Sequence, residues 1–494
     1  MSTNLSAERE ELLRRRLFER SAKKRPALAE GPERGEHPAL SFAQRRLWFL
    51  DQLRPDDVAY VIPAAYRLRG ALDADALERA LTGVVERHEV LRTRFALNGD
   101  EPYQLVGPAA FALRREDLSG AADPVAAARA EASAEAGTPF ALETGPLLRV
   151  RLLKLAAEDH VLLVTVHHSV FDGVSLGLLT REVTAGYAAA LAGERPELPE
   201  LPLQYADFAV RQRAQLSGDR LARHLRQWRE QLADVPQVLE LPVEKSRPLN
   251  PSFQGRSVPF TVPAEVTEGL RGIAREHRAS LYMVTLAAYQ AVLSRHARVD
   301  DLLVGSPVAG RISPAVEQLI GFFVNTVPLR ARLAGEPTFA ELVDQVRETA
   351  LSAFSHQELP IEKLVEELAP TRDLSRNPLI QVWFNLLNTE GGAEVGELAL
   401  AGLDVTQFDT DGTTTRFDVE LHLFDNGTDE LSGELIYATD LFSADTARRL
   451  AGHYLNFLTA VAADPAQRIS RVPIITGEEL ALLDRWNGTT TEAS

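Results

Sequence analysis

The hydrophobic pattern of the chain changes repeatedly between a strand-like and a helix-like period. Residues 161–166 (VLLVTV) form a continuous apolar run rich in β-branched side chains, which is typical of a strand buried on both faces. After a short turn, apolar residues recur at the spacing of an amphipathic helix. The predicted inward face of this helix consists of Val174, Leu178, Leu179, Val183 and Tyr187. Because strands and helices alternate in both halves of the chain, the pattern predicts an α/β protein with sandwich layers.

Capping residues mark several helix ends. Asp73 is a predicted N-cap, since its carboxylate can accept hydrogen bonds from the first amides of the helix that follows. In the second half, two helical segments are predicted to separate near 278–280. A closing helix over 441–462 has Ser443 as its predicted cap. Further strands are predicted at 256–262, 302–305, 380–387, 417–423 and 434–437.

The length of 494 residues predicts two subdomains, because single hydrophobic cores stop growing at about 250–300 residues. Leucines at helical spacing followed by a Lys-, Pro- and Gly-rich stretch predict an N-terminal helix and linker over 1–37. The predicted subdomains cover 38–212 and 213–476. Their boundary falls in a region that is punctuated by proline and then becomes charged and helical.

Composition narrows the function by exclusion. A net charge of −17 argues against nucleic acid and anionic membranes, since both favour Lys and Arg patches. The absence of cysteine excludes thiol nucleophiles, disulfides and thiolate metal sites, and it agrees with a predicted cytoplasmic location. No apolar run approaches the roughly 18 residues of a membrane span, and the charged N-terminus does not have the pattern of a signal peptide.

The main candidate for chemistry is the sequence HHSVFDG. Side chains alternate along a strand, so His167 and His168 are predicted to point to opposite faces, with one of them held in the core by a hydrogen bond. A neutral imidazole can accept a proton from a nucleophile or orient it, and plain packing of the pair is the alternative. Asp172 is predicted to be structural and to pair with Arg311. Gly173 allows close backbone approach near a helix N-terminus, where developing negative charge is stabilised.

Other common chemistries have no support in the sequence. No third ligand at convincing spacing accompanies the two histidines, so no metal site is predicted. The GxxxxGK[ST] loop that binds phosphate is absent, which argues against ATP use. The GxSxG elbow of serine hydrolases is absent as well.

HHSVFDG resembles the HHxxxDG signature of nonribosomal peptide synthetase condensation domains and their chloramphenicol acetyltransferase-like relatives. Six further segments resemble the other motifs of this family and occur in the same order. They are 41–48 (SFAQRRLW, similar to SxAQxRLW), 87–95 (RHEVLRTRF, similar to RHExLRTxF), 205–209 (YADFA, similar to YxDFA), 320–326 (IGFFVNT, similar to IGxFVNT), 356–362 (HQELPIE, similar to HQDxPFE) and 372–379 (RDLSRNPL, similar to RDxSRNPL). The tail 483–487 (LDRWN) resembles the junction that leads into an adenylation domain, so 477–494 is predicted to begin that linker.

The resemblance implies a fold and a reaction. The fold is two chloramphenicol acetyltransferase-like α/β sandwich subdomains in a V-shaped pseudo-dimer, with the active site at their interface. In the implied reaction, an acceptor amine attacks a donor thioester, and both substrates are carried on the phosphopantetheine arms of carrier domains. The implied partners are upstream and downstream peptidyl carrier domains and an adjacent adenylation domain. The domain itself is expected to bind no cofactor.

The resemblance also assigns roles to residues of HHSVFDG. The catalytic histidine is His168, and Gly173 lies close to the acceptor or the oxyanion. Asp172 has a structural role. The residues themselves add His167 and Arg311 as structural members of the same motif.

Residues of the other motifs receive simpler interpretations. Asn325 and Ser375 are candidates for substrate binding. The aromatic motif residues are predicted to pack in the core; they are Trp48, Phe95 and Phe322.

Alternatives stay open within and beyond this family. The intact histidines argue against a heterocyclisation domain, and the opening SFAQRRLW argues against an epimerisation domain. The segment 60–63 (YVIP) favours the subtype that takes an L-configured donor, although Val174 stands where many members have Trp. A domain that also dehydrates a seryl or threonyl donor is one alternative, and a non-catalytic carrier-docking domain is another. A free-standing acyltransferase is disfavoured by the adenylation-like tail.

Overall fold

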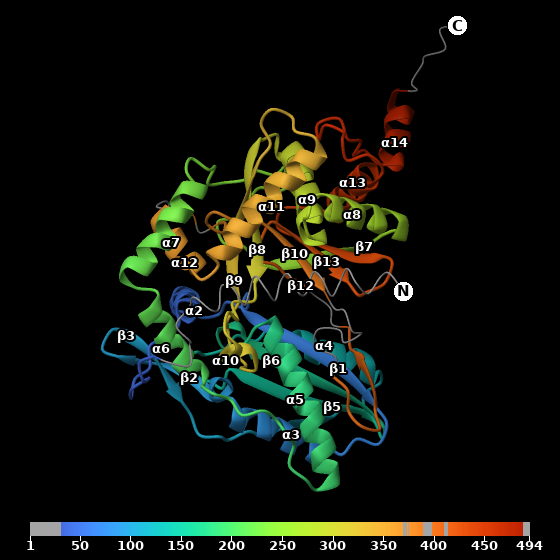
Figure 1. The fold of residues 1–494 in the computed structure, drawn as a ribbon. Coiled ribbons are helices and arrows are strands. Elements are labelled where there is room, and N and C mark those ends of the chain that lie inside the picture. The colour runs from blue at the N-terminus through green and yellow to red at the C-terminus, as the bar shows by residue number, and fades with distance from the viewer. Residues whose placement is uncertain (1–30, 369–372, 374, 389–397, 410–412, 488–494) are drawn as a thin grey trace. The chain divides into compact units, whose positions relative to one another are not determined.

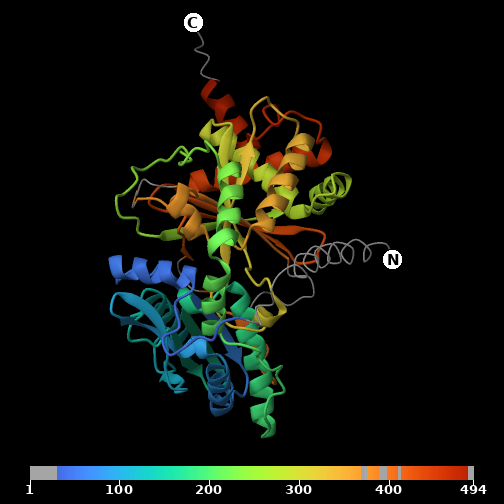
Figure 2. The same cartoon turned by 60° about the vertical axis from the view of Figure 1, so that its left-hand side comes forward.

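The computed structural model describes most of the chain (Figures 1 and 2). The described residues are 31–368, 373, 375–388, 398–409 and 413–487. The predicted N-terminal helix lies outside the described residues, and so does part of the RDLSRNPL segment. No helix in the described ranges is both long enough and apolar enough to span a membrane.

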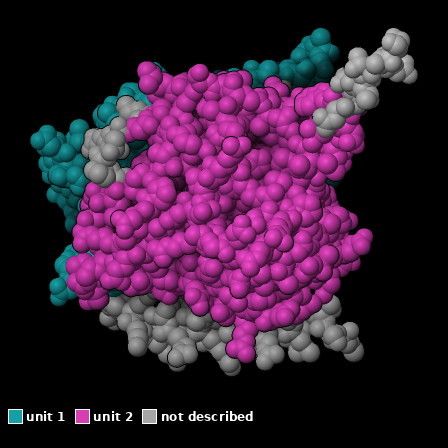
Figure 3. Space-filling model, turned by 90° about the horizontal axis from the view of Figure 1, so that it is seen from above, with its two compact units in different colours: residues 1–221, 309–324, 395–411 teal, residues 222–308, 325–394, 412–494 magenta. Residues whose placement is uncertain are grey.

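The chain folds into two compact units, which are coloured separately in Figure 3. Unit 1 comprises residues 1–221, 309–324 and 395–411, and unit 2 comprises 222–308, 325–394 and 412–494. The spans expected from the sequence were contiguous, whereas two segments of the second half belong to unit 1. The reason lies in their contacts, because 395–411 contains an edge strand of the unit 1 sheet and 309–324 is bonded to side chains of the first half.

A five-stranded sheet forms the centre of unit 1, in the order β11-β1-β6-β5-β4. Its strands are β1 (Val61–Arg69), β4 (Arg114–Asp117), β5 (Leu148–Ala156), β6 (Asp159–His167) and β11 (Asp404–Gln407). The central strand β6 runs antiparallel to both neighbours, with His167 opposite Val61 and Val166 opposite Leu148. All residues of β6 after Asp159 are buried, which confirms the strand predicted at 161–166.

Helices cover both faces of this sheet. Alternate residues of β6 belong to two separate apolar clusters, with Val164 and Val166 in one and Val161 and Leu163 in the other. On the first face lie α3 (Ala74–Arg87) and α5 (Gly173–Ala192), and α4 (Pro124–Ala136) lies on the second. Asp73 caps α3 as predicted, accepting from the amides of residues 75 and 76.

The other elements of unit 1 surround this sandwich. They are α2 (Phe42–Leu53), η1 (Glu89–Arg92), β2 (Thr93–Asn98), β3 (Glu101–Val106), η2 (His168–Val170), α6 (Tyr205–Gln215) and α10 (Pro314–Glu317). β2 and β3 form a hairpin of their own. The next helix, α7 (Gly218–Gln231), begins in unit 1 and continues into unit 2.

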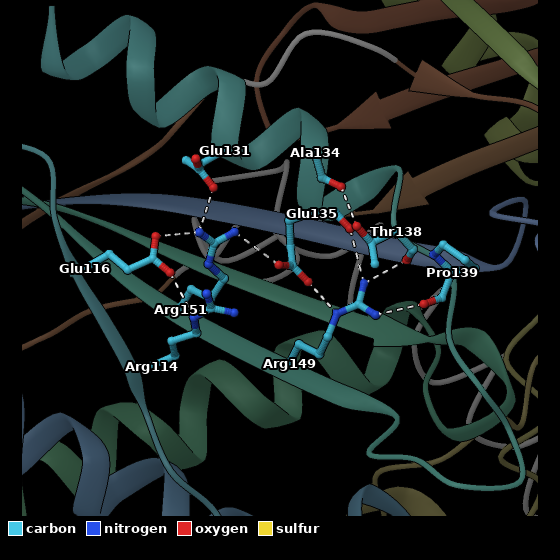
Figure 4. A network of polar contacts seen from close by, with 9 residues as sticks. All are labelled: Arg114, Glu116, Glu131, Ala134, Glu135, Thr138, Pro139, Arg149 and Arg151. Carbon is cyan, nitrogen blue, oxygen red and sulfur yellow. Dashed lines mark hydrogen bonds and ion pairs between the residues drawn. The ribbon is translucent and has the colours of Figure 1, made fainter. Parts of the chain in front are cut away.

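An ion-pair network joins α4 to the sheet (Figure 4). Arg151 of β5 donates to Glu116 of β4 and to Glu131 of α4, each over 2.7 Å, and to Glu135 of α4 over 3.3 Å. Arg149, two residues earlier on the same strand face, also binds Glu135 and donates to carbonyl oxygens at the end of α4. The Arg151 side chain is only 10% exposed, so three carboxylates share a largely buried cation.

Unit 2 is built on a seven-stranded mixed sheet, in the order β12-β7-β14-β13-β10-β8-β9. The strands are β7 (Gln254–Val262), β8 (Asp301–Val308), β9 (Asn325–Arg332), β10 (Val382–Asn388), β12 (Thr413–Thr414), β13 (Val419–Asp425) and β14 (Leu431–Ala438). Its helices are α8 (Ala264–Glu276), α9 (Leu281–Ala297), α11 (Phe339–Ser355), α12 (Ile361–Leu368), α13 (Ala444–Ala463) and α14 (Gly477–Asn487). β10 is parallel to both β13 and β8, and the other pairs are antiparallel.

The elements predicted in the second half are confirmed. Each of the five predicted strands overlaps one strand of the unit 2 sheet. The predicted helix break falls between α8 and α9, where Ser280 caps α9 by accepting from the amide of Met283. Ser443 likewise caps α13, accepting from the amide of Thr446 over 3.3 Å.

Candidate active site

The central strand of unit 1, β6, ends at the first residue of the HHSVFDG segment. The last residue of β6 is His167, and the turn η2 follows directly. The amide of His167 donates to Leu147 O over 3.0 Å, whereas the next amide, that of His168, donates to Tyr60 O over 2.8 Å. The two side chains also differ in their surroundings, since His167 is 5% exposed and His168 is half-buried.

The ring of His167 is held as a neutral imidazole inside unit 1. Its Nδ1 accepts from the amide of Ser169 at 3.2 Å and lies 2.7 Å from the hydroxyl of the same residue. Because a backbone amide can only donate, Nδ1 carries no proton, and the proton of the neutral ring is on Nε2. Burial, with a smaller contribution from His168, lowers the pKa of His167 to about 3. These contacts agree with a structural role.

The ring of His168 has the opposite tautomer. Its Nδ1 lies 2.8 Å from the carbonyl oxygen of Phe171, which can only accept, so Nδ1 carries the proton. In the neutral ring, Nε2 is then the nitrogen that accepts hydrogen bonds. A hydrogen bond to a backbone carbonyl therefore sets which end of this partly exposed imidazole can take a proton.

Asp172 is the N-cap of α5 and forms the predicted ion pair. Its Oδ1 accepts from the amide and hydroxyl of Ser175, at 2.8 and 2.7 Å, and from Nη2 of Arg311 at 3.0 Å. Its Oδ2 accepts from the amide of Phe323 at 2.9 Å. The side chains of Asp172 and Arg311 are 2% and 6% exposed. A buried pair is tolerated when its remaining polar atoms are bonded, and both carboxylate oxygens here are, whereas Nε of Arg311 has no hydrogen-bond partner among the described residues.

Arg311 also orders the segment that carries it. Its Nη1 donates to Val316 O and Leu319 O at 2.9 and 2.6 Å, and its guanidinium lies over the ring of Phe323, 4.2 Å from the centroid. A planar fork can bind several oxygens in fixed directions, whereas a lysine ammonium cannot reproduce this geometry. Arg311 thus anchors 309–324 to the start of α5.

Gly173 opens α5 directly after its cap. It is exposed, and a Cβ placed on it would meet no atom within 4 Å, so packing does not require glycine here. Its amide lies in the first turn of a 20-residue helix, where N–H groups carry partial positive charge. The predicted inward orientation of Val174 is wrong, since this side chain is 42% exposed. The tight packing of α5 on α3 occurs further along, where Gly186 meets Ala80.

Four buried side chains hold the backbone of residues 320–323 (IGFF). The amide of residue 320 donates to Nδ1 of His88 at 3.3 Å, and the amide of residue 321 donates to Oγ of Ser175 at 3.0 Å. The carbonyl of residue 322 accepts from the Tyr205 hydroxyl at 2.6 Å, and the amide of residue 323 donates to Asp172. Two of the four partners come from the start of α5, and the other two, His88 and Tyr205, come from segments far from it in the sequence.

Sequence reasoning did not single out these supporting residues. His88 lies in the RHExLRTxF-like segment, where its Nε2 is 2.9 Å from the buried carboxylate of Glu182. Gln44 lies in the SxAQxRLW-like segment and donates to the carbonyl of Ser169, within η2, over 3.1 Å. The motifs were the available signal, because residues of three other motif-like segments bond to η2 or to residues 320–323.

Asn325 and Ser375, the two predicted substrate contacts, lie in unit 2 and have partners within it. The Asn325 amide donates to Gln357 O and Leu359 O, at 2.8 and 2.7 Å, and its oxygen accepts from the amides of Thr326 and Ile361. These contacts use both donors and both acceptor positions, which argues against a substrate contact and assigns Asn325 to anchoring the HQELPIE loop.

Ser375 belongs to a local turn. Its amide and its hydroxyl both donate to Asp373 Oδ1, at 2.8 and 2.6 Å. A hydroxyl that donates in this way can still accept a hydrogen bond, so its role in substrate binding stays a prediction. Among the described residues, no group of three or more His, Asp or Glu side chains is arranged to hold a metal ion.

Comparison with known sequences places this chain in a family. A sequence model described as "Condensation domain" matches residues 35–483. The chain belongs to the condensation-domain family. Condensation domains of nonribosomal peptide synthetases catalyse amide-bond formation, and they act in multidomain enzymes together with carrier and adenylation domains.

Curated relatives of this condensation domain are much longer synthetases. A linear gramicidin synthase of Brevibacillus parabrevis is 44% identical over 464 residues, which cover 92% of this chain and 6% of the relative. Phosphinothricin tripeptide synthetase PhsC of Streptomyces viridochromogenes is 38% identical over 465 residues, covering 94% of this chain and 42% of the relative. The chain thus spans less than half the length of each.

Solved structures agree with the predicted fold. The X-domain in the complex of X-domain and OxyB from teicoplanin biosynthesis has a TM-score of 0.83 at 32% identity, covering 92% of this chain and 99% of that chain. The first condensation domain of the calcium-dependent antibiotic synthetase has a TM-score of 0.72 at 24% identity, covering 88% and 99%. These likenesses confirm an α/β fold of the chloramphenicol acetyltransferase-like type.

Proposed function

We propose that this condensation domain uses His168 to join a donor acyl or peptidyl thioester to the amine of an acceptor aminoacyl thioester. The observation that carries this proposal is the pair of opposite tautomers at the end of β6. His167 is enclosed and has its proton on Nε2, whereas His168 is partly exposed and has its proton fixed on Nδ1 by Phe171 O. Only the second arrangement leaves Nε2 as the acceptor nitrogen of a ring that is not fully buried.

The proposed step forms one bond and breaks one. The acceptor nitrogen attacks the donor carbonyl carbon while Nε2 of His168 orients the amine and accepts its proton. The carbon–sulfur bond then breaks, and the sulfur leaves as a thiol after taking up a proton. Negative charge that develops on the carbonyl oxygen is stabilised near Gly173, at the N-terminus of α5.

The proposed substrates are carried by partner domains. Both acyl groups are on the phosphopantetheine arms of an upstream and a downstream peptidyl carrier domain, and an adenylation domain is a further partner. Support comes from the length of the curated relatives and from the tail LDRWN. The YVIP segment supports a donor of L configuration, and the absence of cysteine supports a cytoplasmic location.

The test is intact-mass spectrometry of the acceptor carrier after reaction with a donor-loaded carrier. Wild type is expected to add the mass of the donor acyl group. His168→Ala is expected to slow this addition by about 10²–10⁴-fold, the usual contribution of acid–base help, without unfolding. The matched control is His277→Ala, at a partly buried histidine that pairs with Asp344 in unit 2, and it is expected to react like wild type.

Of three other outcomes, the first and the last would contradict the proposal and the second would extend it. A folded His168→Ala variant with the wild-type rate would remove the proposed role of this residue. A gain smaller by one water would indicate that the donor is also dehydrated. Binding of both carriers without any product would favour a carrier-docking domain.

A further inference from the structure

Phe322 packs against the apolar core of unit 1, as the sequence predicts, and its ring also lies against His168. The centroid of its ring is 4.6 Å from that of the imidazole, with the two planes inclined by 54°. Both side chains are half-buried, whereas the neighbours of each along the chain, His167 and Ser169 on one side and Gly321 and Phe323 on the other, are buried. The two rings are therefore the partly exposed members of two otherwise enclosed segments of unit 1.

The backbone that carries Phe322 has little freedom to move. Its own carbonyl accepts from Tyr205, and the flanking amides donate to Ser175 and Asp172. A Cβ added to Gly321 would lie 2.1 Å from the Tyr205 ring, so the chain passes this side chain with no spare room. Because these partners are 1% exposed or less, they have no alternative bonds to water that would let the segment shift.

The Phe322 ring constrains the imidazole of His168 in a way that the hydrogen bond to Phe171 does not. That hydrogen bond fixes the tautomer, but a bond to one ring nitrogen does not by itself fix the tilt of the ring. The Phe322 ring occupies one side of the imidazole and limits this motion. An aromatic ring within about 6 Å also attracts a cation, so it stabilises the imidazolium that forms when Nε2 accepts a proton.

The family pattern leaves this position open. IGFFVNT resembles IGxFVNT, and Phe322 occupies the x. The pattern thus specifies the residues that hold the segment and leaves unspecified the side chain that the segment presents to His168. The side chain that contacts one side of the imidazole is therefore particular to this chain and is not specified by the motif.

We propose that Phe322 is a positioning residue for His168, whose ring holds the imidazole in the orientation that accepts the amine proton. This inference rests on the proposed role of His168. Phe322→Leu removes the ring but keeps an apolar side chain of similar size. It is expected to lower kcat by about 10-fold, a part of the roughly 10²–10⁴-fold supplied by acid–base help, with KM changed less than about twofold.

Three variants separate positioning from a general structural effect. Phe322→Tyr keeps the ring and is expected to retain kcat within about twofold of wild type. Phe111→Leu removes a partly buried ring that packs against the same apolar cluster of unit 1, and it is expected to leave kcat unchanged. In a His168→Ala background, Phe322→Leu is expected to change the residual rate by less than about twofold, because a residue that acts through His168 has nothing left to position.

An NMR measurement detects the contact between Phe322 and His168 independently of enzyme activity. With ¹³C-labelled histidine, the Hε1 resonance of His168 is assigned by its loss in His168→Ala. Phe322→Leu is expected to shift this resonance by removing the ring current, whereas Phe111→Leu is expected to leave it in place. A wild-type kcat in Phe322→Leu, an equal loss of rate with and without His168, or an unshifted resonance would each overturn the proposal. If His168→Ala itself were fully active, the proposed function would fail, and the resonance would still decide whether Phe322 holds the ring.

Discussion

Both carboxylate oxygens of Asp172 accept hydrogen bonds, so a neutral side chain cannot reproduce its contacts. Asp172→Asn would place an NH2 group against either the Phe323 amide or the Arg311 guanidinium, both of which are donors. It would also leave Arg311 buried without a counter-charge. Breaking a buried pair costs about 3–5 kcal/mol, and we expect a loss of this size in urea unfolding, with the slope m unchanged.

Asp123 provides a matched control for this prediction. It is also an aspartate N-cap, of α4, and its side chain accepts only from the amide of Ala126 in an exposed setting. Asn is as good an N-cap as Asp, so Asp123→Asn is expected to change stability by less than about 0.5 kcal/mol. Equal losses in the two variants would show that the Arg311 pair contributes nothing beyond ordinary capping.

The burial of His167 makes stability depend on pH. Its folded pKa is lowered to about 3, below the value of about 6.5 in an unfolded chain. Between these values the unfolded chain binds the extra proton, so stability falls as the pH drops from about 6.5 towards 3, by up to about 1.4 kcal/mol per pH unit.

His167→Asn removes this titration and keeps an oxygen that can accept from Ser169. We expect the variant to be less stable at pH 7, because it loses the packing of the imidazole on Phe140. Its loss of stability between pH 7 and pH 5 is expected to be smaller than that of wild type. Urea unfolding at both values measures the difference, and parallel pH profiles would show that the His167 ring is protonated in the folded protein.

At the scale of single residues, the sequence predicted those contacts that depend on strand alternation or on the pairing of opposite charges. Strand alternation separated His167 from His168, and the need of a buried carboxylate for a cation led to Arg311. The role of Asn325 was not accessible, because it depends on a loop at 357–361 that folds back onto the amide. The contact of Phe322 with His168 was missed for a similar reason, since an aromatic residue at the edge of a core has the same pattern whether or not it also lies against a histidine.

Among the elements, α4 depends on charge more than on apolar contact. The apolar cluster beneath it is small, and two of its members on the helix are alanines, Ala128 and Ala132. Arg151→Met would remove the cation shared by three carboxylates, of which Glu135 and Glu116 are 11% and 25% exposed. We expect a loss of about 1.5–3 kcal/mol in urea unfolding, because three carboxylates lose a charged hydrogen bond. The loss stays below that of an unpaired buried charge, since Arg149 still pairs with Glu135 and Arg114 with Glu116.

Glu131 gives the comparison within the same network. It binds the same guanidinium over 2.7 Å, but its side chain is 41% exposed. Exposed ion pairs contribute about 0–1 kcal/mol, so Glu131→Gln is expected to cost less than about 1 kcal/mol. A smaller loss for Arg151→Met than for Glu131→Gln would mean that burial does not govern this network.

Element prediction succeeded where hydrophobic period and caps are local signals. The strand β6, the break before Ser280 and the cap Ser443 all follow from short stretches of sequence. The membership of 309–324 and 395–411 in unit 1 could not follow from period, because it depends on contacts with residues more than 130 positions away. The same limit applies to the register of β11 on β1.

For the whole molecule, unit 1 depends on the segments 309–324 and 395–411, each of which follows residues of unit 2 in the sequence. They supply six buried apolar side chains to the larger core cluster of unit 1: Val316, Leu319, Ile320, Phe323, Leu398 and Leu400. At about 1.5–3 kcal/mol for each buried side chain, their contribution is together about 9–18 kcal/mol. This is comparable to the net stability of about 5–15 kcal/mol of a typical domain.

A fragment of residues 1–221 is therefore expected not to fold stably by itself. It lacks Arg311, so Asp172 would be buried without its partner, and it lacks β11, so β1 would become an open sheet edge that favours aggregation. Adding a synthetic peptide of residues 309–324 is expected to raise the fraction folded with peptide concentration, since a ligand that binds only the native state stabilises it. Circular dichroism during a peptide titration measures the effect, and the same peptide with Arg311→Ala, which cannot pair with Asp172, is the matched control. The contrary result would be a fragment that unfolds cooperatively by itself, with a stability that neither peptide changes. The first 221 residues would then be sufficient for folding, and the segments 309–324 and 395–411 would not be required.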